Sequence, residues 1–266
     1  MTGMESTQAR LEARIEGVGF WADGLPTWQA ARDFAAGAAP ADDAPRRPSP
    51  ALLAPNERRR APQTVAVALD VALAACEAAG RDPKALPSVF TSTHGDLAIT
   101  DYMAATLADD PRAISPTRFH NSVHNAAAGY WTIGAGCTAA ATAVSAGTAS
   151  FAQGLLEALV QLAAGADAVL LAAYDIGAAG PLGQMTPSEG LLGGALVLSR
   201  GEGGPRLRAD LVDGTPDAGD GPLGTRCGGN AMAPMLPLFD ALATGAGAVL
   251  LDAGPGRALR VELAHD

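Results

Sequence analysis

A sharp junction between a strand-like run and a long apolar helix is the feature that most constrains the fold of this chain. Residues 141–159 read ATAVSAGTASFAQGLLEAL, in which small and β-branched residues lead through Gly147 into apolar residues at helical spacing. The helix ends at Gly165, and DAVLLAAYD at 167–175 follows as the continuous apolar run of a covered strand. A strand, a helix and a buried strand in succession predict an α/β fold.

The rest of the chain continues this alternation. Further strands are predicted at 11–20, 88–93, 193–200 and 206–212, the last two as a pair, with a terminal hairpin around GPGR at 254–257. Further helices are predicted from Thr27 to Phe34, at 64–80 with Thr64 as the cap, from Asp96 to about Leu107, at 115–136 with an interruption at Gly129, and at 237–245.

These elements predict one domain over residues 1–266, with a largely parallel central sheet and helices on both faces. The expected core lies within about 60–200. The six prolines of 38–62 predict a long irregular connection. Glycine and aspartate are frequent in 213–229, which predicts a flexible surface loop.

Charge narrows the class of partner. The 266 residues carry a formal net charge of −10, which repels phosphate backbones and anionic lipid, so we expect no nucleic-acid or membrane-surface binding. An acidic partner protein would need a local basic patch. The arginines that supply one in sequence are Arg46, Arg47, Arg58, Arg59 and Arg60. The alternative interpretation is that these arginines lie in a solvated loop beside the start of a helix and bind no partner.

Cysteine usage and the lack of a targeting segment indicate a cytoplasmic protein. Cys76, Cys137 and Cys227 are widely spaced and odd in number, which argues against a disulfide framework or a zinc site. MTGMESTQAR at the N-terminus lacks the pattern of a signal peptide, and no uninterrupted apolar run reaches about 18 residues. We therefore expect no membrane span.

The spacing of two histidines suggests a metal site, but the residues between them argue against one. His120 and His124 have the i, i+4 spacing of a HExxH zinc site, but Asn121, Ser122 and Val123 lie between them and no glutamate does. The interpretation that we favour is a polar network of His120, Asn121, His124 and Asn125 that anchors a helix start, because buried imidazole and amide groups need partners. No metal is expected.

The sequence also argues against two familiar kinds of chemistry. It contains neither a P-loop nor a GxGxxG turn after its first strand, so we expect no nucleotide and no other cofactor. VSAG around Ser145 is only a degraded form of the nucleophile motif of serine hydrolases. The one histidine after it is His265, next to the end of the chain, where residues are usually frayed.

Several segments together resemble the N-terminal half of a β-ketoacyl synthase, a thiolase-like fold. They are VFTSTHGD at 89–96, SPTRFHNSVHNAAAGYWTI at 115–133, SAGTASFAQGLLEAL at 145–159, GADAVLLAAYD at 165–175 and EGLLGGALVLS at 189–199. HNSVHNAAAGYW is the most specific of them. More narrowly, the chain is similar to the short chain-length-factor-type proteins of aryl polyene biosynthesis clusters. The residues beyond 200 are too few for a complete second thiolase half.

The resemblance implies a fold without the condensing chemistry. Counting from Ala128-Gly129 and from Gly165-Ala166-Asp167 places the nucleophilic cysteine of the family at Thr148. A threonine hydroxyl needs an adjacent base to attack a thioester, whereas a thiolate is nucleophilic near neutral pH. The two catalytic histidines of the family belong to the second half, and His94, His120 and His124 match neither of them.

In this family, such degenerate partners pair with an active ketosynthase and close the end of its acyl tunnel. The resemblance therefore implies a heterodimer, contact with an acyl carrier protein and a limit on acyl or polyene chain length. Candidates for the tunnel and interface are Phe119, Tyr130, Trp131, Thr148 and Phe151. The alternative for Tyr130, Trp131 and Phe151 is a plain place in the core. Two other functions stay open: an acyltransferase or thioesterase using Thr148, Ser145 or Ser150, and an acyl-chain binding module.

Overall fold

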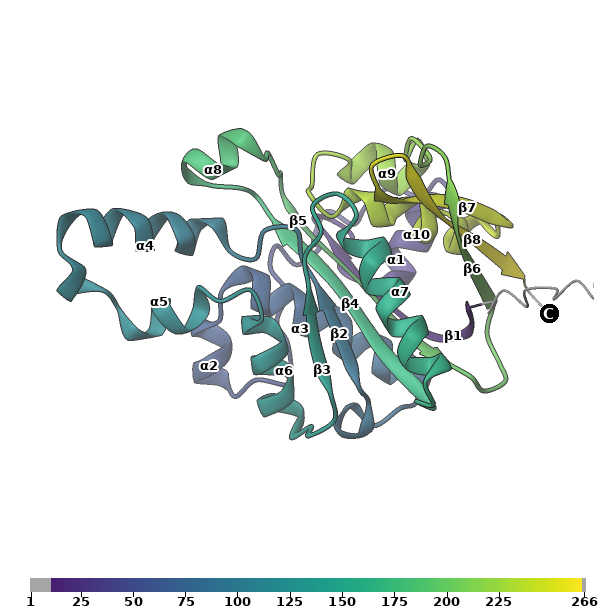
Figure 1. The fold of residues 1–266 in the computed structure, drawn as a ribbon, viewed down its shortest axis with the longest axis horizontal. Coiled ribbons are helices and arrows are strands. Elements are labelled where there is room, and N and C mark those ends of the chain that lie inside the picture. Colours follow the sequence, from purple (N-terminus) through teal and green to yellow (C-terminus); the bar gives the residue numbers. More distant parts are fainter. Residues whose placement is uncertain (1–10, 265–266) are drawn as a thin grey trace, which may run out of the picture.

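One eight-stranded sheet runs through the computed structural model, which describes residues 11–264 (Figure 1). Its spatial order is β3-β2-β4-β5-β1-β6-β8-β7. The strands are β1 (Leu11–Ala22), β2 (Ser88–Thr91), β3 (Ala141–Val144), β4 (Ala168–Ile176), β5 (Leu191–Ser199), β6 (Arg206–Asp213), β7 (Ala248–Gly254) and β8 (Arg257–Ala264).

The sheet is mixed, and the prediction of a largely parallel sheet is wrong. Only β2 with β3 and β2 with β4 run parallel, while the other five neighbouring pairs are antiparallel. These three parallel strands follow one another along the chain through helical connections, and the sequence pattern predicts the helices of those connections. The antiparallel half comes from the long strand β1, which inserts between β5 and β6. The expected pairing of 193–200 with 206–212 is therefore wrong too.

Helices cover both faces of this sheet, as predicted. They are α1 (Trp28–Ala35), α2 (Pro55–Arg60), α3 (Gln63–Ala79), α4 (Leu97–Asp109), α5 (Pro116–Asn121), α6 (Ala126–Ala135), α7 (Ser150–Ala163), α8 (Gly180–Met185), α9 (Pro222–Cys227) and α10 (Leu236–Thr244). Short 3-10 turns lie at Pro83–Ala85, Pro111–Ala113 and Ala233–Met235. The α/β fold class is confirmed.

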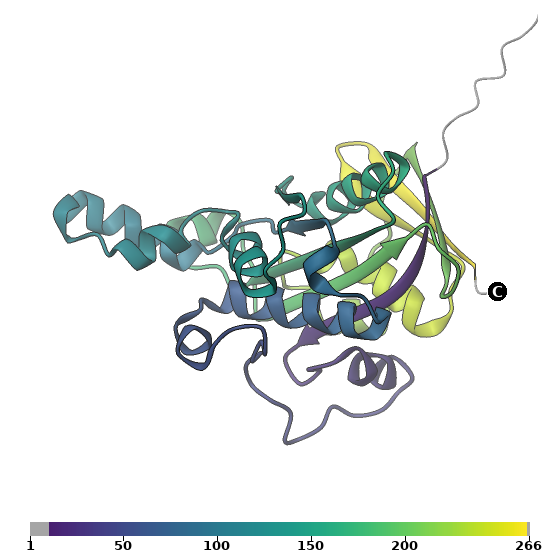
Figure 2. The same cartoon turned by 90° about the horizontal axis from the view of Figure 1, so that it is seen from below.

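The two faces carry two separate hydrophobic cores. On one face α3 crosses β1, β5 and β4, with α6 beside it, and buries Leu69, Phe90 and Trp131. On the other face α7 crosses β4, β2 and β1, and buries Phe151 and Phe239 together with residues of α10. Figure 2 shows α3 below the sheet and α7 above it. Burying apolar area on both faces makes the central strands nearly continuous apolar runs.

Glycines in β1 let α3 approach the sheet closely. A Cβ on Gly17 would overlap the carbonyl oxygen of Ala75, and a Cβ on Gly19 would overlap that of Val71. The alternating glycines of GVGF therefore allow the backbone of α3 to lie directly against β1. Apolar burial on this face depends on that contact, because α3 is buried over most of its length.

Several predicted boundaries shift. Thr64 lies inside α3, whose N-cap is Pro62, and its hydroxyl donates instead to Asp96 at 3.2 Å. The predicted helix over 115–136 is two helices separated at 122–125, and Gly129 lies within α6 without interrupting it. A turn after Asn121 interrupts the predicted helix, and in it Ser122 Oγ donates to the carbonyl of Phe119 at 2.8 Å. The segments 38–62 and 213–229, both expected to be irregular, contain α2 and α9.

A helical projection extends away from the sheet. It consists of α4, α5 and α8, which extend beyond the sheet on one side (Figure 1). Helix α4 contacts both α5 and α8. The large apolar side chains exposed on and beside these helices are Leu107, Phe119, Val123, Leu182 and Met185. Over the residues that the structure describes, no helix is long and apolar enough to cross a membrane.

Candidate functional site

The predicted elbow is a tight turn between β3 and α7. Gly147 has φ +59, a left-handed conformation that glycine adopts without a Cβ penalty. Ser150 Oγ donates to the carbonyl of Gly147 at 2.6 Å and accepts from the amide of Ala146 at 2.9 Å. Ser145 Oγ donates to the carbonyl of Thr93 at 3.1 Å. The hydroxyls of both serines are therefore engaged in hydrogen bonds that stabilise the turn.

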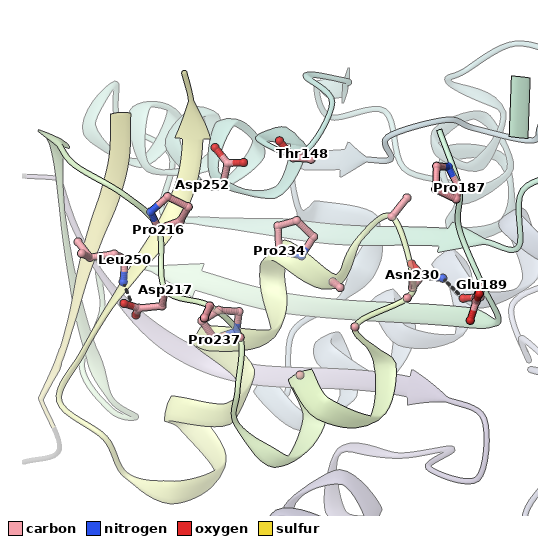
Figure 3. Close-up of a pocket in the computed structure, with 17 residues that line it drawn as sticks. Thr148, Pro187, Glu189, Pro216, Asp217, Asn230, Pro234, Pro237, Leu250 and Asp252 are labelled. Atoms are coloured by element: carbon pink, nitrogen blue, oxygen red, sulfur yellow. Dashed lines mark hydrogen bonds between the residues drawn. The ribbon is translucent and has the colours of Figure 1, made fainter. Parts of the chain in front are cut away.

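Thr148 differs from the two serines. It lies two residues before α7, is exposed, and its hydroxyl has no hydrogen-bond partner within the described chain. Figure 3 draws it at the edge of a cavity of about 550 Å³. Among the five predicted tunnel and interface residues, Thr148 is the one that lines this cavity.

The cavity walls come from segments far apart in the sequence. Thr148 faces loop residues around Pro187 and Asn230 and, on the opposite side, β7 and the loop before α9 (Figure 3). Its ionisable lining residues are Glu189, Asp217 and Asp252, and no lysine, arginine or histidine of the described residues lines it. Asp217 accepts from the amide of Leu250 at 2.8 Å, and Asp252 accepts from the amide of Gly254 at 2.9 Å.

This lining limits the chemistry that Thr148 has available. A hydroxyl nucleophile needs a base within hydrogen-bond reach, most often an imidazole. His94, His120 and His124 lie outside the cavity lining. Cysteine does not replace it, because burial raises the pKa of Cys76 to about 12 and that of Cys227 to about 11. Neither thiol is a thiolate near neutral pH.

Asp175 is the functional residue that the sequence reasoning missed. It is fully buried at the end of β4 and accepts from Ser92 Oγ at 2.6 Å, from Thr93 N at 2.8 Å and from His94 N at 3.3 Å. Thr93 Oγ1 in turn lies 3.3 Å from the carbonyls of Gly147 and Ala231. The carboxylate thus holds the turn that supports the elbow. Burial raises the pKa of Asp175, against the lowering effect of these donors.

Asn230 connects the same framework to the cavity wall. Its side-chain amide donates to the carbonyls of Glu189 at 2.9 Å and Asp175 at 3.3 Å. The available signal for Asp175 was a charged residue at the end of an otherwise apolar, buried strand. Asn230 had none, because it lies in a glycine-rich loop and its partners are distant in sequence.

The predicted network of histidines and asparagines does not form as expected. His124 Nε2 lies 2.8 Å from the carbonyl oxygen of Ser92, whereas the ring of His120 packs against Tyr130 at 5.9 Å between centroids. Within residues 11–264, the buried Oδ1 of Asn121 has no hydrogen-bond partner, and the side chain of Asn125 makes no capping bond. The turn at 122–125 separates α5 from α6, so His120 lies in α5 and His124 lies in the turn after it. The shared helix face that the i, i+4 spacing suggested is therefore absent.

The candidate aromatic residues divide between core and surface. Trp131 is fully buried against Phe90, with ring centroids 6.1 Å apart, and Phe151 packs against Phe239 at 6.2 Å. These positions match the alternative of plain core residues. Phe119 is 59% exposed on α5, and Tyr130 is half-buried on α6.

The arginines of the predicted basic patch lie on two segments: Arg59 and Arg60 on α2, and Arg46 and Arg47 in the irregular connection before it. All four are exposed. Arg58 is different, because its guanidinium donates to the carbonyl of Leu53 at 2.9 Å and so holds the proline-rich connection.

Comparisons with known proteins agree on one family. The model of the β-ketoacyl synthase N-terminal domain matches residues 27–221, which is well over half of the chain. No curated protein matches. Among solved structures, a chain from the ketosynthase ApeO in complex with its chain length factor ApeC from Xenorhabdus doucetiae has a TM-score of 0.74 at 24% identity. The match covers 94% of this chain and 98% of that one.

Two further structures are similar over comparable lengths. A chain from the ishigamide ketosynthase/chain length factor has a TM-score of 0.69 at 15% identity, covering 94% of this chain and 98% of that one. A chain from AntDE:AntF, a type II polyketide acyl carrier protein in complex with its ketosynthase, has a TM-score of 0.72 at 13% identity, covering 97% and 100%. These likenesses confirm the predicted thiolase-like ketosynthase fold. With the family match, they show that the chain belongs to the β-ketoacyl synthase N-terminal domain family.

Proposed function

We propose that this chain is a non-catalytic, chain-length-factor-type subunit that pairs with an active ketosynthase and limits the length of its acyl or polyene product. The observation that carries the proposal is Thr148, exposed at the elbow in a cavity whose described lining has no histidine. The similar structures are chains from ketosynthase complexes with chain length factors, and this chain covers almost all of each. That likeness supports the same role here.

The two edges of the sheet support a partner at β3. At the β7 edge, Asp217 accepts from the amide of Leu250 through its carboxylate at 2.8 Å, and its own amide donates back to Leu250 at 2.8 Å. This bonding occupies the free edge of β7 at Leu250. No described segment pairs with the outer side of β3, where Ala141 and Ala143 are exposed. An open strand edge is a template for pairing with another chain.

The helical projection offers apolar surface for the same partner. Phe119 and Val123 are 59% and 47% exposed, and Leu182 and Met185 lie on α8. Contiguous exposed apolar side chains are typical of an interface. We propose that Phe119 limits tunnel depth by its bulk, because an aromatic ring fills volume with few torsions to order.

The exposed arginines around α2 suit an acidic carrier protein. One of the similar structures contains an acyl carrier protein. Against a net charge of −10, a local group of Arg46, Arg47, Arg59 and Arg60 is the surface on which such a partner would meet least repulsion. Arg60→Glu in the assembled complex should therefore weaken carrier-protein binding, and more so at low salt.

Co-expression with a ketosynthase encoded beside this chain tests the proposal. Wild type should co-migrate with the ketosynthase in size exclusion. Ala143→Lys should separate the two chains while leaving this chain folded, because an edge lysine opposes strand addition. Val160→Lys on α7, also exposed, is the control and should leave the complex intact. Separate migration of the wild-type chains would contradict the proposal.

Product analysis then tests the length limit. In a complex that still assembles, Phe119→Ala should shift the products towards longer chains, while Leu107→Ala on α4 should not. An unchanged distribution in the Phe119 variant would remove Phe119 from the proposed role and leave the pairing proposal intact.

A stand-alone acyltransferase or thioesterase is the second candidate, and the free hydroxyl of Thr148 is the observation that favours it. It requires a covalent acyl adduct on Thr148 after incubation with an acyl thioester, detected by intact-protein mass spectrometry and lost in Thr148→Val. We expect no adduct. Ser145 and Ser150 are weaker candidates, because their hydroxyls donate to the carbonyls of Thr93 and Gly147.

A further inference from the structure

A long stretch without charged residues crosses the middle of the chain. Residues 119–156 contain no aspartate, glutamate, lysine or arginine, although these four residue types make up 17% of the whole sequence. The stretch includes α6, β3 and the first half of α7. The cores of protein interfaces are depleted in charged residues relative to the rest of a protein surface. Where this stretch is exposed, it therefore marks a candidate contact surface.

Part of this uncharged stretch lies at the surface beside the β3 edge. Ile133 on α6 is 78% exposed, and Ala141 and Ala143 of β3 are exposed as well. Helix α6 contacts β3 and lies beside it in Figure 1. The sequence of α6, AAAGYWTIGA, has no charged residue on any side of the helix. A helix that is apolar all round is normally covered on every side, and this one is not.

The backbone of β3 offers hydrogen-bonding groups on its outer side. Ser92 N donates to the carbonyl of Val144 at 3.3 Å, so this carbonyl faces β2. Because bonding groups alternate between the two sides of a strand, the N–H and C=O groups of Ala141 and Ala143 face outward. The strand ATAV contains no lysine or proline, and its pairing with β2 has no bulge. The usual obstacles to strand addition are therefore missing from β3.

Charge and symmetry together favour a second copy of this chain as the occupant of this surface. Each copy carries a formal net charge of −10, so two copies repel each other least where they meet through an uncharged surface. Two identical β3 edges pair antiparallel about a two-fold axis, and the outward groups of the same two alanines then bond in both directions. Such a contact is closed, because it leaves no free edge at β3.

We infer that, in the absence of a ketosynthase, two copies of this chain form a homodimer through β3 and the exposed Ile133 beside it. The inference rests on the proposed function in one respect, because the proposed ketosynthase partner uses the same edge. The homodimer and the heterodimer therefore exclude each other. The homodimer covers the open edge of the unassembled subunit until a ketosynthase replaces the second copy.

Sedimentation equilibrium of the isolated full chain tests the inference, and a reversible monomer–dimer equilibrium is expected. Ala143→Lys places two lysines close to the two-fold axis, so their repulsion should raise the dissociation constant at least about tenfold. Ile133→Glu should raise it in the same way. Leu211→Glu is the matched control, because it adds the same charge at an exposed leucine of β6, which four strands separate from β3. It should change the dissociation constant less than about twofold.

The salt dependence of the equilibrium gives a second readout. Sodium chloride screens the repulsion between two acidic chains, so the dissociation constant of the wild-type homodimer should fall as salt is added. A contact made by ion pairs would weaken instead. Circular dichroism establishes that each variant is folded. A wild-type chain that stays monomeric at every concentration, a dimer that salt weakens, or equal effects of the Ile133 and Leu211 variants would overturn the inference.

Addition of the ketosynthase separates this inference from the proposed function. The homodimer should convert into a heterodimer that contains one copy of this chain, as measured by native mass spectrometry. A complex that contains two copies of this chain bound to the ketosynthase would overturn the shared edge. A chain that is monomeric alone but pairs with the ketosynthase would overturn only the homodimer. A homodimer that never exchanges with the ketosynthase would contradict the proposed function and leave the homodimer in place.

Discussion

At the residue scale, Asp175 shows how a single buried carboxylate organises a turn. Three donors from consecutive residues of one turn converge on it, and Asn230 binds its backbone carbonyl. Thr93 of this turn also binds the elbow. Its carbonyl accepts from Ser145 Oγ, and its hydroxyl donates to the carbonyl of Gly147. The conformation of the elbow therefore depends on a side chain that neither lines the cavity nor lies near Thr148 in sequence.

Replacing that carboxylate by an amide of the same size should destabilise the chain. Asp175→Asn turns an amide donor towards either the Thr93 or the Ser92 donor, which leaves a buried donor unsatisfied. We expect the free energy of unfolding to fall by about 2 kcal/mol. Asp167→Asn is the control, since its side chain is 90% exposed and should cost less than about 1 kcal/mol. Urea denaturation followed by circular dichroism measures both, and equal midpoints would refute the role.

The pair of Glu16 with Arg81 should make part of the stability depend on pH. Two bonds of 2.7 Å join the side chains, and the hydrogen bonds from Arg81 are the main cause that lowers the pKa of Glu16 from 4.5. Because the folded-state pKa is lowered, the pair stabilises the fold above pH 4.5 and loses this effect as the pH falls through the folded value.

Arg81→Gln should therefore lower the free energy of unfolding by about 1 kcal/mol at pH 7, a modest value because Arg81 is partly exposed. The difference from wild type should shrink as the pH falls below 4.5. Urea titrations at a series of pH values measure it. Arg112→Gln, which breaks a pair that is 96% exposed on the arginine side, should show no such trend. A difference independent of pH would exclude the ion pair as its cause.

Sequence reasoning located the elbow but left the place of the aromatic residues open, for a physical reason. The elbow is a local feature, so small residues and a glycine directly before a helical apolar pattern are enough to predict it. Whether Trp131 or Phe151 lines a tunnel or fills a core depends on what packs against it, and Phe90 and Phe239 come from distant segments. Aromatic residues suit both places equally.

At the element scale, the helices were easier to predict than the pairing of the strands. Helices α3, α7 and α10 follow from periodicity and from glycines at their ends, which are local signals. The insertion of β1 between β5 and β6 joins residues almost 200 positions apart, such as Glu12 and Arg208. The hydrophobic pattern of a single strand does not indicate which distant strands pair with it.

Alanine substitutions at two glycines should change stability in opposite directions, because Gly19 lies against α3 and Gly129 has open space around it. Gly19→Ala would push a methyl group into the carbonyl of Val71, so the helix must shift and the free energy of unfolding should fall by about 3 kcal/mol. Gly129→Ala meets nothing within 4 Å inside α6, so better helix propensity should raise that free energy by about 0.5–1 kcal/mol. Urea denaturation of the two variants measures both signs. A neutral Gly19 variant would disprove the close approach.

At the scale of the whole molecule, the two edges of the sheet differ. The loop before α9 bonds to the free edge of β7 through Asp217, whereas no described segment pairs with the outer side of β3. Two open edges would allow chains to join into extended assemblies, whereas one open edge allows a closed pair. The loop that we expected to be a flexible surface feature thus has a defined structural contact.

Opening the second edge should therefore change how the isolated chain associates. Asp217→Ala removes the side-chain acceptor for the amide of Leu250, so that this edge donor of β7 becomes available to another chain, while the backbone bond from residue 217 to Leu250 remains. We expect stronger light scattering that grows with protein concentration and persists when the proposed ketosynthase partner is bound. Asp213→Ala is the matched control, because it removes the same charge from an exposed pair with Arg257. If both variants scatter alike, lost charge and not the open edge is responsible, and the covered-edge argument fails.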